Sequence, residues 1–97
     1  MGNKPGIGKA NARLALAYQR AGDVGRALSH YETAIEILQD TEDTHSLAEM
    51  HLSMGILHSE IGQIATAKQQ YKKAQELFEA LGDSHNAQRA AEESRKL

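Results

Sequence analysis

Residues 21–34 read AGDVGRALSHYETA, and residues 61–74 read IGQIATAKQQYKKA. The second stretch begins forty residues after the first, and four identical residues recur in register: Gly22 with Gly62, Ala27 with Ala67, Tyr31 with Tyr71 and Ala34 with Ala74. Self-similarity at a fixed period of this size is typical of helical-repeat proteins. We therefore divide the chain into a first unit at 2–41, a second unit at 42–81 and a partial third unit at 82–97, which together form one domain over residues 1–97.

Each full unit is predicted to hold two helices, and the partial unit one. In the second unit Leu47, Met50, Met54 and Leu57 recur every three or four residues, which is the spacing of one apolar helical face. Asp43 and Asp83 suit the N-cap position, and Gly22 and Gly62 suit the left-handed residue that ends a helix. Helices are expected over about 4–21, 24–40, 44–61, 64–81 and 84–97. Because the turns are short, neighbouring helices must pack antiparallel, and the fold class is all-α.

The positions of small and aromatic residues resemble the tetratricopeptide repeat (TPR) family. The first unit carries Leu14, Ala15, Tyr18, Ala27, Tyr31 and Ala34 at the family's characteristic places, and the second carries Met54, Gly55, His58, Ala67, Tyr71 and Ala74. The 40-residue period is similar to the longer variety found in kinesin light chains and Pins-type adaptors. The chain departs from the family at Asn11 and His51, which are polar where a large packing residue is usual. The resemblance implies helix-turn-helix repeats stacked as a right-handed α-solenoid, ending in a capping helix at 82–97.

Composition excludes several classes of function. The chain has 11 Lys and Arg against 13 Asp and Glu, a net charge of −2, which gives no basic footprint for nucleic acid or for a membrane surface. It has no cysteine, so disulfides and thiolate chemistry are excluded. No apolar run approaches the roughly 20 residues of a membrane span, and no signal-peptide core is present. We expect a soluble, intracellular (cytoplasmic) protein.

The glycine-rich stretch GNKPGIGKA at 2–10 raises a nucleotide-binding alternative. A Walker A loop ending at Gly8-Lys9 needs Gly at position 3 and Ser or Thr at position 10, but the chain has Asn3 and Ala10. We interpret the stretch instead as the start of the first helix. The histidines show no set of four convergent ligands by spacing, and no Ser-His-acid set can be placed. The chain is therefore predicted to be no enzyme and to bind no cofactor or metal.

The family resemblance implies that the first helix of each unit lines a concave groove. The groove residues expected from it are Lys9, Arg13, Leu16, Arg20, Leu52, Ser53, Ile56 and Glu60. Such a groove suits a partner protein segment, a peptide or helix, with an apolar anchor and acidic neighbours. The alternative is that these residues form a solvent-exposed helix face that binds no partner.

A second alternative is a self-assembling or spacer unit that associates through its end faces. The chain would then be a fragment of a longer array, or engineered from one, because such arrays usually need three or more repeats.

Overall fold

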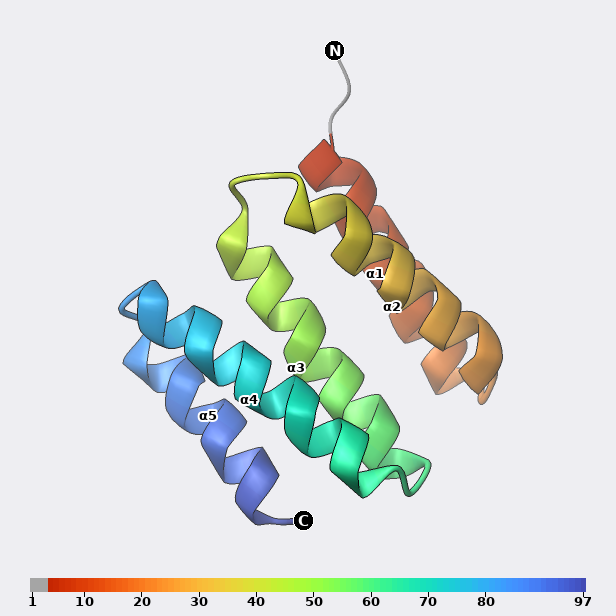
Figure 1. Ribbon diagram of the computed structural model, residues 1–97. Helices are drawn as coiled ribbons and strands as arrows, with labels where there is room; N and C mark the ends of the chain where they lie inside the picture. Colours follow the sequence, from red (N-terminus) through yellow and green to blue (C-terminus); the bar gives the residue numbers. More distant parts are fainter. Residues whose placement is uncertain (1–3) are drawn as a thin grey trace.

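The computed structural model describes residues 4–97, and five α-helices make up most of this range (Figure 1). They are α1 (Lys4–Arg20), α2 (Val24–Gln39), α3 (Thr44–Glu60), α4 (Ile64–Ala80) and α5 (Ser84–Arg95). No strand occurs within residues 4–97, so the all-α prediction is confirmed. Every helix ends within two residues of its predicted end. Gly2 and Asn3, with which the predicted first unit begins, lie outside the described residues.

Three turns share one glycine-dependent geometry. Gly22, Gly62 and Gly82 have φ angles of 83°, 80° and 74°, in the left-handed region. After each glycine, the next backbone N–H donates to a carbonyl five residues earlier, at 2.8 to 2.9 Å. This Schellman arrangement satisfies carbonyls that the end of a helix leaves without partners, and glycine adopts the required φ without a Cβ clash. The local sequence therefore ends each helix at its glycine. The short turns that follow fix the antiparallel pairing of α1 with α2 and of α3 with α4.

Aspartate carboxylates cap three of the helices. Asp23, Asp43 and Asp83 each accept a hydrogen bond from the backbone N–H three residues later, at 3.1, 3.1 and 3.2 Å. The N-caps predicted at Asp43 and Asp83 are confirmed. Helix α4 instead follows Gln63, whose side chain makes no capping bond.

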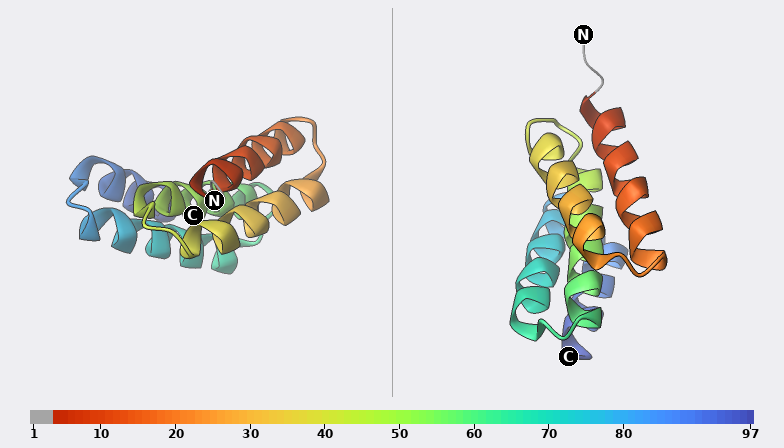
Figure 2. Two further views of the ribbon diagram at one scale, coloured as in Figure 1. Left: turned by 90° about the horizontal axis from the view of Figure 1, so that it is seen from above. Right: turned by 90° about the vertical axis from the view of Figure 1, so that its right-hand side faces the viewer.

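The helices form two layers, with α1, α3 and α5 in one and α2 and α4 in the other (Figure 2). Their buried residues form two clusters. The first contains Ala15, Ala27, Tyr31, Met54 and Leu57. The second contains Ala48, Leu52, Ala67, Tyr71, Ala74, Phe78, Ala87 and Ala90. Each pair of helices thus completes its core with residues from the helix that follows, as expected for a solenoid of stacked repeats.

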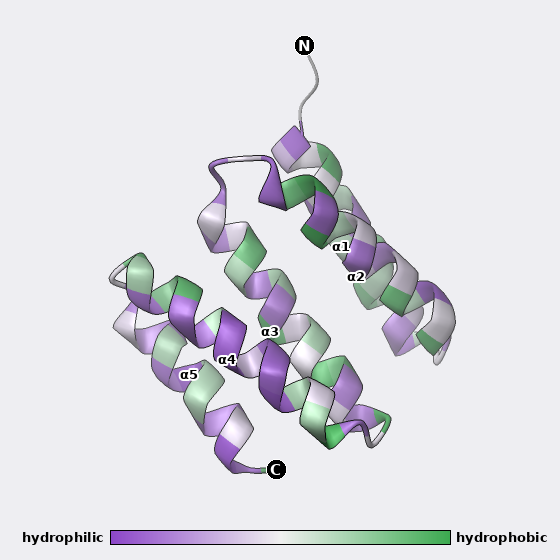
Figure 3. Ribbon diagram, in the orientation of Figure 1, coloured by the Kyte–Doolittle hydropathy of each residue, from purple (hydrophilic) through white to green (hydrophobic). Residues whose placement is uncertain are grey.

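Small residues set how closely the helices approach. A Cβ built on Gly55 would lie 2.6 Å from the Tyr71 ring, and one on Gly8 would lie 2.7 Å from Leu38 Cγ. The stretch around Gly8 is therefore a packed part of α1. Hydrophobic and hydrophilic residues are interspersed along the helices (Figure 3). Helix α3, which packs against both α2 and α4, has buried residues on more than one side.

Candidate functional site

Two adjoining hollows lie between α1 and α3. One, of about 220 Å³, is lined by Lys9, Ala12, Arg13, Leu38, Ser46, Glu49 and Met50. The other, of about 210 Å³, is lined by Ala12, Arg13, Leu16, Tyr31, Met50 and Ser53. Because Ala12, Arg13 and Met50 border both hollows, the two form one depression. We call it the α1–α3 groove.

An ion pair includes Lys9, one of the residues that line this groove. Lys9 Nζ lies 3.6 Å from Asp43 Oδ2. Asp43 also accepts hydrogen bonds from the Ser46 hydroxyl at 2.8 Å and from the Ser46 backbone N–H. The Ser46 hydroxyl bond, followed by the Ser46 N–H and the Lys9 charge, holds the pKa of Asp43 below its ordinary value. The carboxylate is therefore charged at neutral pH and engages Lys9.

Two arginines of α1 form no ion pair with any residue in the described part of the chain. Arg13 and Arg20 are exposed, and neither takes part in an ion pair or side-chain hydrogen bond among residues 4–97. The two lysines of α1 differ, since Lys4 Nζ lies 3.8 Å from Asp40 Oδ2 and Lys9 is paired as described above. Helix α1 contains no Asp or Glu. The groove side of α1 therefore presents positive charge to an incoming group.

A hydrogen-bonded chain ties three helices together beside the groove. The Tyr31 hydroxyl donates to Gln19 Oε1 at 2.9 Å, and Gln19 Nε2 donates to Glu60 Oε1 at 2.6 Å. Tyr31 is 2% exposed, and its burial raises the pKa of the phenol above its ordinary value. The phenol thus stays neutral and remains a donor, and Glu60 is held by this chain.

The residues expected to line a groove fall into two groups. Lys9, Arg13, Leu16 and Ser53 line the α1–α3 groove, and Leu16 is 40% exposed. Arg20 lies one helical turn beyond Leu16, on the same face.

The two apolar residues expected from α3 are placed differently. Leu52 is only 4% exposed and belongs to the second core cluster, against which Ile56 also packs. The same cluster includes Ala87 and Ala90 of α5. The apolar contribution of α3 to the groove is instead Met50.

Sequence reasoning assigned Met50 and Tyr31 to helix packing alone. Both belong to the first core cluster or pack against it, yet both also border the groove. A signal for Met50 was present, because it precedes Ser53 by three residues and so shares a helix face with it. No comparable spacing identifies Tyr31, whose position depends on how α2 lies against α1 and α3.

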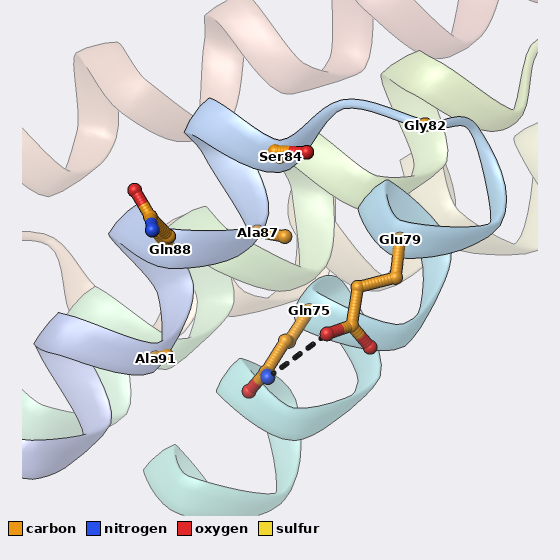
Figure 4. Close-up of a pocket in the computed structure, with 7 residues that line it drawn as sticks. All are labelled: Gln75, Glu79, Gly82, Ser84, Ala87, Gln88 and Ala91. Atoms are coloured by element: carbon orange, nitrogen blue, oxygen red, sulfur yellow. Dashed lines mark hydrogen bonds between the residues drawn. The ribbon is translucent and has the colours of Figure 1, made fainter.

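A third hollow, of about 240 Å³, lies between α4 and α5 (Figure 4). Its lining residues are Gln75, Glu79, Gly82, Ser84, Ala87, Gln88 and Ala91. Gln75 Nε2 donates to Glu79 Oε2 at 3.3 Å, so the longer side chains partly satisfy each other. Forty residues earlier, Ile35 and Leu47 occupy the places of Gln75 and Ala87. Smaller side chains at this second interface account for the hollow.

Buried histidines are structural. His58 is 8% exposed and its Nδ1 lies 2.6 Å from Gln63 Oε1, so it is packed and hydrogen-bonded. His51 is 9% exposed with its Nδ1 2.6 Å from Gln70 Oε1. Within residues 4–97 no group of three His, Cys, Asp or Glu side chains is placed to hold a metal ion. No helix in the same range is long and apolar enough to span a membrane.

Comparison with known proteins gives one match. A family model described as the tetratricopeptide repeat matches residues 7–80, a range that covers most of α1 and all of α2, α3 and α4, with the groove between α1 and α3. Neither the curated proteins nor the solved structures yielded a match.

Proposed function

The chain belongs to the tetratricopeptide repeat family, and from this premise we propose that it is a non-catalytic adaptor module that binds a segment of a partner protein in the α1–α3 groove. Repeats of this family generally act in protein–protein interaction. One observation carries the choice of site: Arg13 and Arg20, both free of ion pairs within the described chain, flank the exposed Leu16 of a continuous depression. The fitting partner is a peptide or helix with an apolar side chain next to acidic residues.

The apolar contact and the ion pairs contribute binding free energies of different size, so they have different roles. An apolar anchor buried against Leu16 and Met50 contributes about 1.5–3 kcal/mol of binding free energy. An exposed ion pair to Arg13 or Arg20 contributes only about 0.2–1 kcal/mol and is screened by salt. The anchor therefore supplies most of the affinity, while the arginines accelerate association and select acidic neighbours.

The competing function is self-assembly through the end faces of the molecule. Charge repulsion opposes assembly in which two copies meet through α1. Helix α1 carries four cationic residues and no carboxylate, so two copies meeting through α1 would repel each other. Sedimentation at increasing protein concentration separates the two functions. A constant monomer mass supports the binding module, and a rising mass favours assembly.

The decisive experiment screens a peptide library against the protein and against Arg13→Glu/Arg20→Glu. We expect the selected peptides to combine an apolar residue with acidic neighbours and to bind the double variant at least about tenfold more weakly, a loss of 1.4 kcal/mol. The matched control is Lys68→Glu/Lys72→Glu, which makes the same change of charge on exposed residues of α4. Absence of any binder, or equal affinity for both double variants, would contradict the proposal.

A further inference from the structure

The side of α1 that faces away from α3 carries a second apolar surface. Its members, Ile7, Ala10, Leu14 and Ala17, recur at intervals of three and four residues, which places them in one line along the helix. All four are exposed, with Ile7 at 50% and Leu14 at 47%. We call these four residues the α1 outer stripe. It is distinct from the α1–α3 groove, because Leu16 points to a different side of the helix from Leu14.

The repeat itself shows what covers such a stripe. Forty residues later, Leu47, Met50, Met54 and Leu57 form the equivalent line on α3. Met54 is 5% exposed and Leu57 1% exposed, and both pack in one cluster with Ala27 and Tyr31 of α2. On α5, Ala87 is likewise buried in one cluster with Tyr71 and Phe78 of α4. On α3 and on α5, therefore, the stripe is covered by the second helix of the preceding repeat.

Helix α1 lies at one end of its layer, with α2 packed on its inner side (Figure 2). Its outer stripe thus repeats an interface that the molecule makes twice elsewhere, but no helix among residues 4–97 covers it. Bordering the stripe, Arg13 lies three residues after Ala10, and Arg20 lies three residues after Ala17. Near Arg13 and Arg20, a covering helix with acidic residues beside its apolar face is electrostatically favoured, and a second α1 is disfavoured. The Ile7 end of the stripe differs, because Ile7 shares a hollow with Glu36 and Asp40 of α2.

We propose that the α1 outer stripe docks an acidic amphipathic helix of another protein, which lies on α1 as α2 lies on α3. The stripe shares Arg13 and Arg20 with the border of the proposed groove, but its apolar residues are different, so variants of the apolar residues let each site fail without the other. Its occupant carries apolar residues at three- and four-residue spacing with Asp or Glu at the margins. The chain would then bind through both sides of α1.

The chain provides two probe peptides that share the small and aromatic residues of the repeat and carry net charges of opposite sign. A labelled peptide copying residues 22–41 carries the α2 interface with four acidic residues and one arginine. A peptide copying residues 62–81 carries the α4 interface with three lysines and two glutamates. Fluorescence anisotropy with the full chain should show saturable binding of the acidic peptide and at least about tenfold weaker binding of the basic one.

Two equally exposed leucines, Leu14 and Leu81, give matched variants. Leu14→Glu removes an apolar contact from the outer stripe and should weaken the acidic peptide at least about tenfold. Leu81→Glu places the same charge on an exposed leucine just after α4, outside both the stripe and the groove, and should leave the affinity within about twofold. Both side chains are exposed, and circular dichroism confirms that each variant remains helical.

Three outcomes would overturn the proposal. The first is no saturable binding of the acidic peptide, and the second is equal binding of that peptide to the Leu14→Glu and Leu81→Glu variants. The third is a dimer of the chain that Leu14→Glu dissociates, because the occupant would then be a second copy. If Leu16→Glu abolishes binding of the library peptides while Leu14→Glu leaves binding of the acidic peptide unchanged, the groove is supported and the stripe is rejected.

Discussion

At the scale of single residues, His51 shows how a repeat absorbs a polar group into its core. Its Nδ1 donates to Gln70 Oε1, and its Nε2 is buried without a hydrogen-bond partner. In the first repeat the equivalent pair is exchanged: Asn11 stands at the place of His51, and its Oδ1 lies 3.0 Å from His30 Nδ1. Both pairs join residues nineteen apart, so the same two positions hold one histidine and one amide in either order.

Burial of His51 predicts a pH-dependent stability. Desolvation, the largest cause, lowers the pKa of His51 below its ordinary value of 6.5, although the Gln70 bond opposes it and Lys73 adds to it. The unfolded chain therefore binds a proton more readily than the folded chain. The contribution of His51 is fully present above pH 6.5 and is lost as the pH falls below that value, by up to about 1.4 kcal/mol per pH unit.

Urea denaturation between pH 7.5 and 5 measures this effect. The exchange His51→Asn/Gln70→His, which copies the first repeat, serves as the matched variant. Its free energy of unfolding should depend less steeply on pH than that of the parent. Identical slopes in the two proteins would show that His51 is not the responsible group.

At the scale of helices, Gly55 sets the distance between α3 and α4. A Cβ at Gly55 would lie 2.6 Å from two atoms of the Tyr71 ring, well inside van der Waals contact. Gly55→Ala gains about 1 kcal/mol of helix propensity, but overpacking costs about 1–3 kcal/mol. We expect a net loss of about 1 kcal/mol in the free energy of unfolding, measured by urea denaturation.

Gly25→Ala is the control for this prediction. Gly25 lies in α2, and a Cβ there would meet nothing closer than Asp23 Oδ1 at 3.9 Å. Gly25→Ala therefore gains helix propensity without overpacking, and the variant should be more stable by about 0.5–1 kcal/mol. The prediction fails if both alanine variants change stability in the same direction.

The helices were predictable from sequence because their signals are local. The aspartate caps, the left-handed glycines and the apolar spacing each act within one helix or turn, and they give all five elements to within two residues. The groove was predictable only in part. Arg13 and Leu16 are exposed by their place on α1, whereas the burial of Leu52 depends on how closely α5 approaches, which no local pattern encodes.

At the scale of the whole molecule, the two repeats share a pattern but differ in surroundings. Helix α3 packs against α2 and α4, whereas α1 packs chiefly against α2. Fewer buried contacts lower the free energy of local opening. Amide hydrogen exchange followed by NMR should therefore be faster in α1 than at the equivalent positions of α3.

The best comparison uses amides forty residues apart. Ala15 and Gly55 are both buried at equivalent places, so a faster rate at Ala15 reports the opening of α1 rather than a difference in exposure. Equal protection at the two amides would mean that the repeats open together as one cooperative unit.

Packing between helices that follow one another along the chain also has a consequence for folding. The main contacts join α1 with α2, α2 with α3, α3 with α4 and α4 with α5. The chain therefore gives up little loop-closure entropy before its contacts form, and helical proteins with such short-range contacts fold in roughly microseconds to milliseconds. The helical hairpins α1–α2 and α3–α4 can each nucleate folding. Folding can therefore begin in either repeat and spread to its neighbour.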